Sequence, residues 1–278
     1  MLSALERTAS WPVENVSAAV VAQDDTHVIG DQDRPYRIAS VAKTMVGWVA
    51  MVAVEEGIIS LDDPLGQPGC TMRHLLAHAG GYPFDGAEPI ARPGARRAYS
   101  NIGIEMVADA IAAAAAMPFE RYLHEALFEP LGMSRSELRG SPAHGVWSTA
   151  RDLTAYVREL MSPTLVTRES ATLATTPHFT DLAGIIPGLG RFDPCPWGLG
   201  FEVRGSKSPH WTGTRNSPGT FGHFGGAGTL LWVDRGPAGG RSVGCVALTD
   251  RLFDDWAAQA LVLWPQLSDA VLAEAAGR

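Results

Sequence analysis

The stretch Ser40-Val41-Ala42-Lys43 opens a run of small and apolar residues that continues to Val54. This run predicts a helix that begins near Ser40, because serine is a favoured N-cap. One turn of helix then separates the serine hydroxyl from the lysine amine and leaves both on one face. A partly desolvated lysine near the positive end of a helix can lose its proton and activate the serine. An ordinary capped helix with a surface lysine is the alternative, since S-x-x-K is a common pattern.

The composition indicates a globular protein of one large or two modest domains. The chain has 278 residues, of which 46% are hydrophobic and 19% are charged. Its formal net charge is −8 and it carries no Lys/Arg cluster, which argues against a nucleic-acid or anionic-membrane partner. No apolar run reaches the length of a membrane span.

The cysteines and the amino terminus favour a cytoplasmic location. Cys70, Cys195 and Cys245 are far apart and odd in number, which fits free thiols, although one disulfide remains an alternative. The first seven residues lack a basic region followed by an apolar stretch, so no signal peptide is visible.

Strand patterns occur at both ends of the chain, and helical patterns lie between them. Strands are expected over residues 16–23, 27–30, 197–203, 228–233 and 243–248, with a turn at Asp24-Asp25 and a Gly/Pro loop at 236–240. Helices are expected over residues 40–54, 72–79 and 102–127, from 149 onward and from 254 onward. The simplest architecture is a mixed α/β (α+β) fold with one antiparallel sheet built from both termini and flanked by helices.

This pattern divides the chain into two parts. Residues 1–59 and 196–278 form the sheet domain, and residues 60–195 form an inserted, mostly helical domain. A catalytic cleft is expected between them.

Two further motifs carry chemically useful groups. Tyr99-Ser100-Asn101 precedes an alanine-rich helix, and it is either a helix start or a phenol and an amide placed for catalysis. The segment 222–229, Gly-His-Phe-Gly-Gly-Ala-Gly-Thr, precedes a strand. It is either a glycine-rich turn or a close backbone approach whose N–H group can hold an oxyanion.

Taken together, Ser-x-x-Lys, Tyr-x-Asn and His-x-Gly in this order resemble the serine β-lactamase and penicillin-binding protein superfamily, in particular the class C β-lactamase-like branch. The flanking motifs agree: residues 61–64, 72–81, 130–133, 145–153 and 197–201. The resemblance covers about residues 15–250. It implies a β-lactamase-like fold and an enzyme that needs no cofactor and no metal.

The resemblance also implies a role for each site residue. Ser40 becomes the acylated nucleophile, Lys43 its proton acceptor and Tyr99 the group that passes a proton to the leaving group. Asn101 orients the lysine and the substrate. The backbone N–H groups of Ser40 and Gly226 form the oxyanion hole.

One departure from the family pattern redirects the expected substrate. His223-Phe224-Gly225 replaces the Lys-Thr-Gly of true β-lactamases. Histidine is mostly neutral at pH 7 and phenylalanine donates no hydrogen bond, so a carboxylate-bearing β-lactam loses two partners. Phe224 suggests an apolar wall instead.

The expected function is therefore that of a serine hydrolase that works through an acyl-enzyme on Ser40, acts on small esters or D-amino-acid amides, and has weak or no β-lactamase activity. Its expected partner is a small-molecule ester, amide or peptide substrate. The alternatives are a penicillin-binding or sensor protein that is acylated without efficient turnover, and a true β-lactamase. His74 and His78 stand four residues apart, but no acidic third ligand is near, so a metal pair is not expected. The sequence leaves the oligomeric state open.

Overall fold

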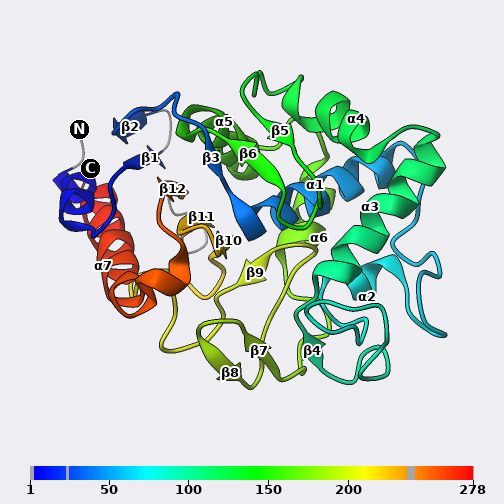
Figure 1. Ribbon diagram of the computed structural model, residues 1–278. Helices are drawn as coiled ribbons and strands as arrows, with labels where there is room; N and C mark the ends of the chain where they lie inside the picture. Colours follow the sequence, from blue (N-terminus) through cyan, green and yellow to red (C-terminus); the bar gives the residue numbers. More distant parts are fainter. Residues whose placement is uncertain (1–2, 23–24, 237–241, 278) are drawn as a thin grey trace.

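The centre of the molecule is a six-stranded antiparallel sheet, seen in a computed structural model that describes residues 3–22, 25–236 and 242–277. The strand order is β2-β1-β12-β11-β10-β9 (Figure 1). The strands are β1 (Val16–Ala22), β2 (Asp25–Ile29), β9 (Glu202–Val203), β10 (Phe221–Gly225), β11 (Thr229–Asp234) and β12 (Val243–Thr249). Because β1 pairs with β12, the two ends of the chain share one sheet, as predicted.

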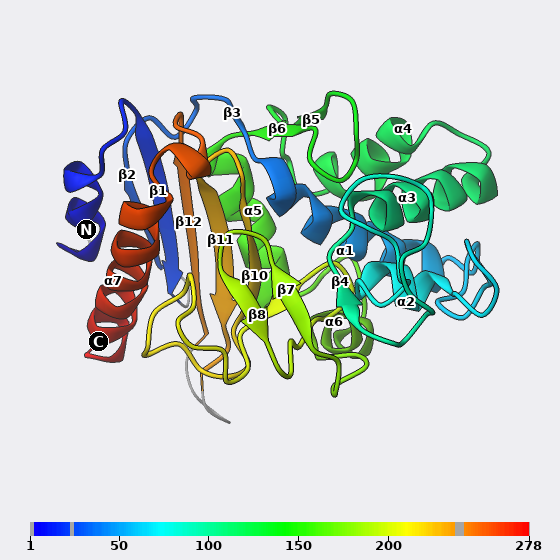
Figure 2. The same cartoon turned by 60° about the horizontal axis from the view of Figure 1, so that its bottom comes forward.

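Alternation along the strands gives the sheet two apolar faces. Val20 of β1 belongs to one core cluster, together with residues of α7 (Ala257–Ala276) and η1 (Ser3–Ser10). Its neighbour Val21 belongs to the other cluster, together with Val157 of α5 (Ala150–Met161). Figure 2 shows α7 and α5 on opposite sides of the sheet. The fold is thus a sheet between two helical layers.

The remaining helices lie beyond the β9–β10 edge of the sheet (Figures 1 and 2). They are α1 (Ala42–Glu55), α2 (Met72–Leu76), α3 (Asn101–Ala115), α4 (Phe119–Leu123), η3 (His124–Phe128) and α6 (Arg168–Thr175). The predicted helix over 102–127 is broken, because Ala116 adopts a positive φ of 52° and Pro118 follows it. The domain boundaries stay a prediction. Helix α5 lies within residues 60–195, the predicted helical domain, and packs on the sheet.

Two small sheets complete the fold. One has the order β3-β6-β5, with β3 (Tyr36–Arg37), β5 (Glu137–Leu138) and β6 (Val146–Ser148). The other has the order β4-β7-β8, with β4 (Arg97–Ala98), β7 (Gly184–Ile186) and β8 (Gly190–Phe192). Two short 3-10 turns, η2 (Ala39–Val41) and η4 (Phe253–Asp255), flank the cavity described below.

The predicted strand over 197–203 is wrong for most of its length, since only Glu202–Val203 is a strand. The preceding residues pack tightly against α1 instead. Gly200 has a positive φ of 83°, and a Cβ there would collide with the backbone of Lys43 and Gly47. This close approach fixes α1 beside the end of the sheet, which positions the lysine.

Three other sequence predictions can be compared with the fold. The cysteines are unpaired and buried, so the alternative of a disulfide is wrong. Within the described residues no single helix is long and apolar enough to cross a membrane, although α3 with α4 and η3, bent by 87°, passes that test as a pair. Gln23, Asp24 and residues 237–240 of the predicted loop lie outside the described residues.

Candidate active site

Ser40 lies in η2, just before α1, and not at the helix N-cap. The N-cap is Val41, which makes no side-chain cap, and the predicted capping role of Ser40 is therefore wrong. The preceding Ala39 has a positive φ of 48°, which is unusual for a residue with a side chain. This turn leaves the Ser40 hydroxyl uncommitted to the helix and free to meet Lys43. Strain of this kind often marks functional sites.

Lys43 is completely buried beside Ser40. Its Nζ donates to Asn101 Oδ1 at 2.7 Å and to the Ala143 carbonyl at 2.9 Å, and it lies 3.1 Å from Ser40 Oγ. Burial lowers the pKa of Lys43 to about 7, although Glu105 and Asp85 act in the opposite direction. A neutral amine has two N–H groups and one lone pair. Because the two carbonyl oxygens take two N–H groups, a protonated Lys43 donates its third to Ser40 Oγ, whereas a neutral Lys43 can accept the serine proton there.

Asn101 is the first residue of α3, and its amide orientation is set from both sides. Its Oδ1 accepts from Lys43 while its Nδ2 donates to Asp85 Oδ1 at 3.0 Å. Ser100 is the N-cap of α3, since its Oγ accepts from the Gly103 N–H at 3.0 Å. The local sequence Tyr-Ser-Asn thus starts a helix and also brings the Asn101 amide to Lys43, while the catalytic interpretation of the motif stays a prediction.

Tyr99 lies against Lys43, with Nζ 4.9 Å from the ring centroid, and its hydroxyl is 3.3 Å from His223 Nε2. His223 Nδ1 is 2.5 Å from the Phe224 carbonyl, which accepts only, so Nδ1 carries the proton and Nε2 accepts from the phenol. Burial, with a smaller contribution from Lys43, lowers the pKa of His223 to about 3. Burial also raises the pKa of Tyr99, and its hydrogen bond to Ser40 offsets part of that effect. At neutral pH the pair is therefore a phenol beside a neutral imidazole.

His78 packs against the ring of Tyr99, a role that the sequence did not indicate. It is buried, its ring centroid lies 4.6 Å from that of Tyr99, and its Nδ1 accepts from the Ser100 N–H at 3.2 Å. Trp197 packs against Tyr99 and His223, each at 5.7 Å between ring centroids. The sequence signals for these contacts with Tyr99 were the motifs over residues 72–81 and 197–201, which contain His78 and Trp197. Neither motif indicates the contacts themselves, because they depend on the tertiary fold.

The N–H groups of Ser40 and Gly226 donate to no other backbone group among the described residues. Gly226 is held in place by its carbonyl, which accepts from the Phe253 N–H at 2.9 Å. Gly225 permits the approach of β10 to η2, since a Cβ there would collide with the Ile38 carbonyl. Ser40 and Gly226 thus lie within two residues of this close backbone contact, and their predicted role as an oxyanion hole stays a prediction.

A cavity of about 170 Å³ opens over these groups. Ser40, Tyr99, His223 and Gly226 contribute its polar atoms, and the remaining lining is mainly apolar: Phe84, Ile186, Pro187, Gly188, Phe224, Phe253 and Asp254. Phe224 packs against Phe253, with ring centroids 5.2 Å apart. It occupies the position at which the Lys-Thr-Gly motif of true β-lactamases has threonine, a hydrogen-bond donor. The structure thus places an aromatic wall at Phe224, as the sequence suggested.

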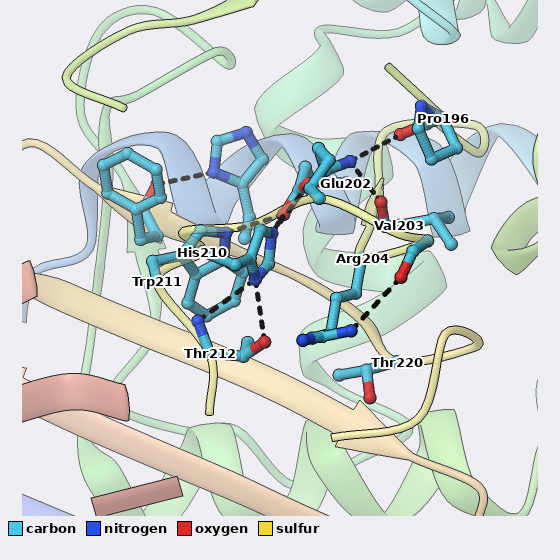
Figure 3. Close-up of polar contacts among 12 residues, drawn as sticks. Pro196, Glu202, Val203, Arg204, His210, Trp211, Thr212 and Thr220 are labelled. Atoms are coloured by element: carbon cyan, nitrogen blue, oxygen red, sulfur yellow. Dashed lines mark hydrogen bonds and ion pairs between the residues drawn. The ribbon is translucent and has the colours of Figure 1, made fainter. Parts of the chain in front are cut away.

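A cluster of buried polar and charged groups surrounds Glu202 of β9 (Figure 3). The carboxylate of Glu202 is 2.5 Å from Lys207 Nζ and 3.0 Å from His210 Nε2, and it accepts from Trp211 Nε1 at 2.6 Å. Burial alone would raise the pKa of Glu202, but His210 and Lys207 outweigh it and lower the pKa. Glu202 pairs with Gly222 across β9 and β10, so the cluster anchors the strand that carries His223.

The structure does not bring His74 and His78 together as a metal pair. His74 is hydrogen-bonded to Thr71 Oγ1 at 2.9 Å and stacks on Phe179, whereas His78 lies under Tyr99. Within the described ranges there is no group of three or more histidine, cysteine or acidic residues placed to hold a metal ion.

Comparisons with known proteins identify the family of the chain. Residues 10–261 match the beta-lactamase family. A beta-lactamase (Mb2281c) of Mycobacterium bovis is 47% identical, with a TM-score of 0.93 over 98% of this chain and 99% of that chain. A beta-lactamase/D-alanine carboxypeptidase of Yersinia pestis is 18% identical, with a TM-score of 0.74 over 98% of each chain, which shows a shared fold.

Among curated sequences, the D-alanyl-D-alanine-carboxypeptidase/endopeptidase AmpH of Escherichia coli K12 is 28% identical over 147 residues. That match covers 40% of this chain and 38% of the relative, so it spans about two fifths of the relative's length. Fold and matches together define the class of protein as a serine hydrolase. The chain belongs to the beta-lactamase family.

Proposed function

We propose that this hydrolase cleaves small esters or D-amino-acid amides through an acyl-enzyme on Ser40. One observation carries the proposal: the buried Lys43 amine, whose pKa is lowered to about 7, lies 3.1 Å from the Ser40 hydroxyl oxygen. A base with a pKa near the working pH is the most effective proton acceptor. The roles of the site residues and the location in the cytoplasm are part of the proposal.

In the first step, Lys43 takes the proton of Ser40, and Oγ forms a bond to the substrate carbonyl carbon. The N–H groups of Ser40 and Gly226 hold the oxyanion. Tyr99, kept as a phenol by burial, gives its proton to the departing alcohol or amine. The resulting tyrosinate is stabilised by the protonated Lys43 beside its ring.

In the second step, the tyrosinate takes a proton from water, whose oxygen attacks the acyl carbon. The bond to Ser40 Oγ breaks, and Lys43 returns its proton to the serine. The neutral His223 accepts the hydrogen bond of the restored phenol. Every group ends in its starting state, so no cofactor enters the cycle.

A β-lactamase is the second candidate, favoured by the description of the 47% identical Mycobacterium bovis relative. The cavity argues for esters and amides instead, because His223 is uncharged and Phe224 is apolar where a β-lactam carboxylate would need partners. Neither group compensates the cost of burying a carboxylate.

A substrate panel separates these candidates. Initial rates are measured for p-nitrophenyl butyrate, D-alanine p-nitroanilide and nitrocefin, with wild type and Ser40→Ala. We expect turnover of the ester or the amide that exceeds that of nitrocefin and is lost in Ser40→Ala. Faster turnover of nitrocefin would assign a β-lactamase, and stable acylation without turnover would assign a sensor. Equal rates in Ser40→Ala would overturn the role of the serine.

A further inference from the structure

A second and larger groove, of about 370 Å³, adjoins the cavity at Ser40. Phe84, Tyr99 and Pro187 line both spaces, so the two lie on either side of these side chains. Ligand sites usually have volumes of roughly 300–1,000 Å³. The cavity alone, at about 170 Å³, is smaller than this range, whereas the groove lies within it. A substrate that fills both spaces is therefore larger than a short-chain ester.

The floor of the groove is the small sheet β4-β7-β8. Ala98 of β4 pairs with Ile185 of β7, and Ile185 pairs with Arg191 of β8. These three neighbours line the groove, and so does Arg96, which precedes Ala98 by two residues and lies on the same face. Arg97 points to the other side, where its guanidinium donates to four backbone carbonyls: those of Ala77, His178, Phe179 and Cys195.

Large apolar side chains are unusually exposed in this groove. Phe84, Ile90 and Ile185 are 48%, 53% and 61% exposed, and all three line it. Apolar side chains that gather in this way on a surface commonly mark a binding site. Phe84 also stacks on Tyr99, with ring centroids 5.7 Å apart, so it forms the wall between the groove and the catalytic residues.

The charge of the groove is opposite to that of the chain. No acidic residue lines it, although the chain has a formal net charge of −8. Arg96 is exposed and has no hydrogen-bond or ion-pair partner in the described part of the chain. Arg191 has only a loose ion pair with Asp193, 3.8 Å long between side chains that are 72% and 67% exposed. Such exposed pairs hold little energy, so both guanidinium groups are available to an anion.

We propose that the groove binds an extended apolar arm of the substrate that ends in a carboxylate, which Arg96 and Arg191 hold. This rests on the proposed acyl-transfer function and names its substrate class. Phe84, Ile90 and Ile185 cover the methylene groups of the arm. The reacting carbonyl then lies in the smaller cavity, between Ser40 and Gly226.

Binding to Ser40→Ala tests the groove without requiring turnover. Calorimetric titrations use three methyl esters with arms of eight carbons: monomethyl suberate, methyl octanoate and methyl 8-aminooctanoate. We expect monomethyl suberate to bind most tightly and the amino ester most weakly. Adding Arg96→Gln and Arg191→Gln together weakens monomethyl suberate by about fivefold, since each exposed pair contributes modestly. Adding Ile185→Ser weakens all three esters.

Two matched substitutions outside the groove serve as controls. Arg121→Gln removes another exposed arginine, and Val262→Ser removes another exposed aliphatic side chain that is 53% exposed. Both leave the three dissociation constants unchanged. Equal affinities for the three esters, or unchanged affinity in the double arginine variant, would overturn the groove assignment. Absence of turnover of both p-nitrophenyl butyrate and D-alanine p-nitroanilide in wild type would overturn the proposed function instead, so the two failures are distinguishable.

Discussion

Replacing Lys43 with methionine is expected to abolish acylation and to change how stability depends on pH. Methionine fits a buried aliphatic site but has no basic nitrogen. General-base catalysis by a placed side chain contributes about 10²–10⁴-fold, so the rate of Ser40 acylation falls by that factor. The environment of Lys43 lowers its pKa from 10.5 to about 7, so the folded protein binds this proton less tightly than the unfolded chain.

The sign of the stability effect follows from this difference. Below pH 7 the amine is protonated in both states, and the folded state bears the full cost of burying the charge. Between pH 7 and 10.5 the unfolded chain keeps a proton that the folded protein has released, so wild type gains stability as the pH rises. Integrated from pH 6 to pH 9, this gain is on the order of 3 kcal/mol relative to Lys43→Met.

Urea unfolding of both proteins at pH 6 and pH 9 measures the gain, and labelling with a fluorophosphonate measures acylation. The titration of groups that do not interact with Lys43 is shared by both proteins and cancels in the difference, and His223, whose pKa Lys43 helps to lower, is already neutral at pH 6 in the folded protein. A stability difference that is the same at both pH values would refute the buried, weakly basic Lys43. Labelling of Lys43→Met at the wild-type rate would refute its role as the base.

Three further predictions test the frame around the site. Gly225→Ala is expected to destabilise the protein by about 1–3 kcal/mol and to slow ester turnover, because the new Cβ collides with the Ile38 carbonyl beside η2; unchanged melting and turnover would contradict this contact. Glu202→Gln removes the negative charge that faces the buried Lys207 ammonium. It is expected to lower the free energy of unfolding, measured in urea, by about 3–5 kcal/mol. Because the pKa of Glu202 is lowered in the folded state, wild type should also lose this stability as the pH falls below 4.5, and Glu202→Gln should lack that loss. Burial raises the pKa of the Cys70 thiol to about 11, that of Cys245 to about 12, and also that of Cys195. A disulfide reagent at pH 8 should therefore react slowly with the folded protein and should modify all three thiols after unfolding. Rapid modification of the folded protein would show that the thiols are accessible.

The order of motifs predicted which residues meet at the site, but it did not predict how the backbone presents them. Ser40 was expected to cap the helix, which would have committed its hydroxyl to a backbone N–H. The strained turn at Ala39 moves it out of that position. No local sequence signal marks this strain, because it is imposed by β10 packing against η2 through Gly225.

The sheet was predictable because the strand patterns at both termini are short apolar runs flanked by turn residues. The segment 197–201 was not, because its alternation of glycine with large apolar residues serves a tight contact with α1 instead of a strand. The groove walls at Phe84 and Ile90 lie in a Pro/Gly-rich loop, and a single sequence does not determine the shape of such a loop. The packing of His78 against Tyr99 was not predicted either, because it depends on long-range contacts that a single sequence does not determine.

The most direct test of the account is the site of covalent modification. Wild type and Ser40→Ala are incubated with a fluorophosphonate, whose phosphorus bonds to the serine oxygen as fluoride leaves, and intact masses and peptide maps are recorded. The account predicts one adduct per chain, located on Ser40 and absent from Ser40→Ala, with a labelling rate that rises with pH around 7 as Lys43 loses its proton. An adduct on another residue, or equal labelling of Ser40→Ala, would contradict it.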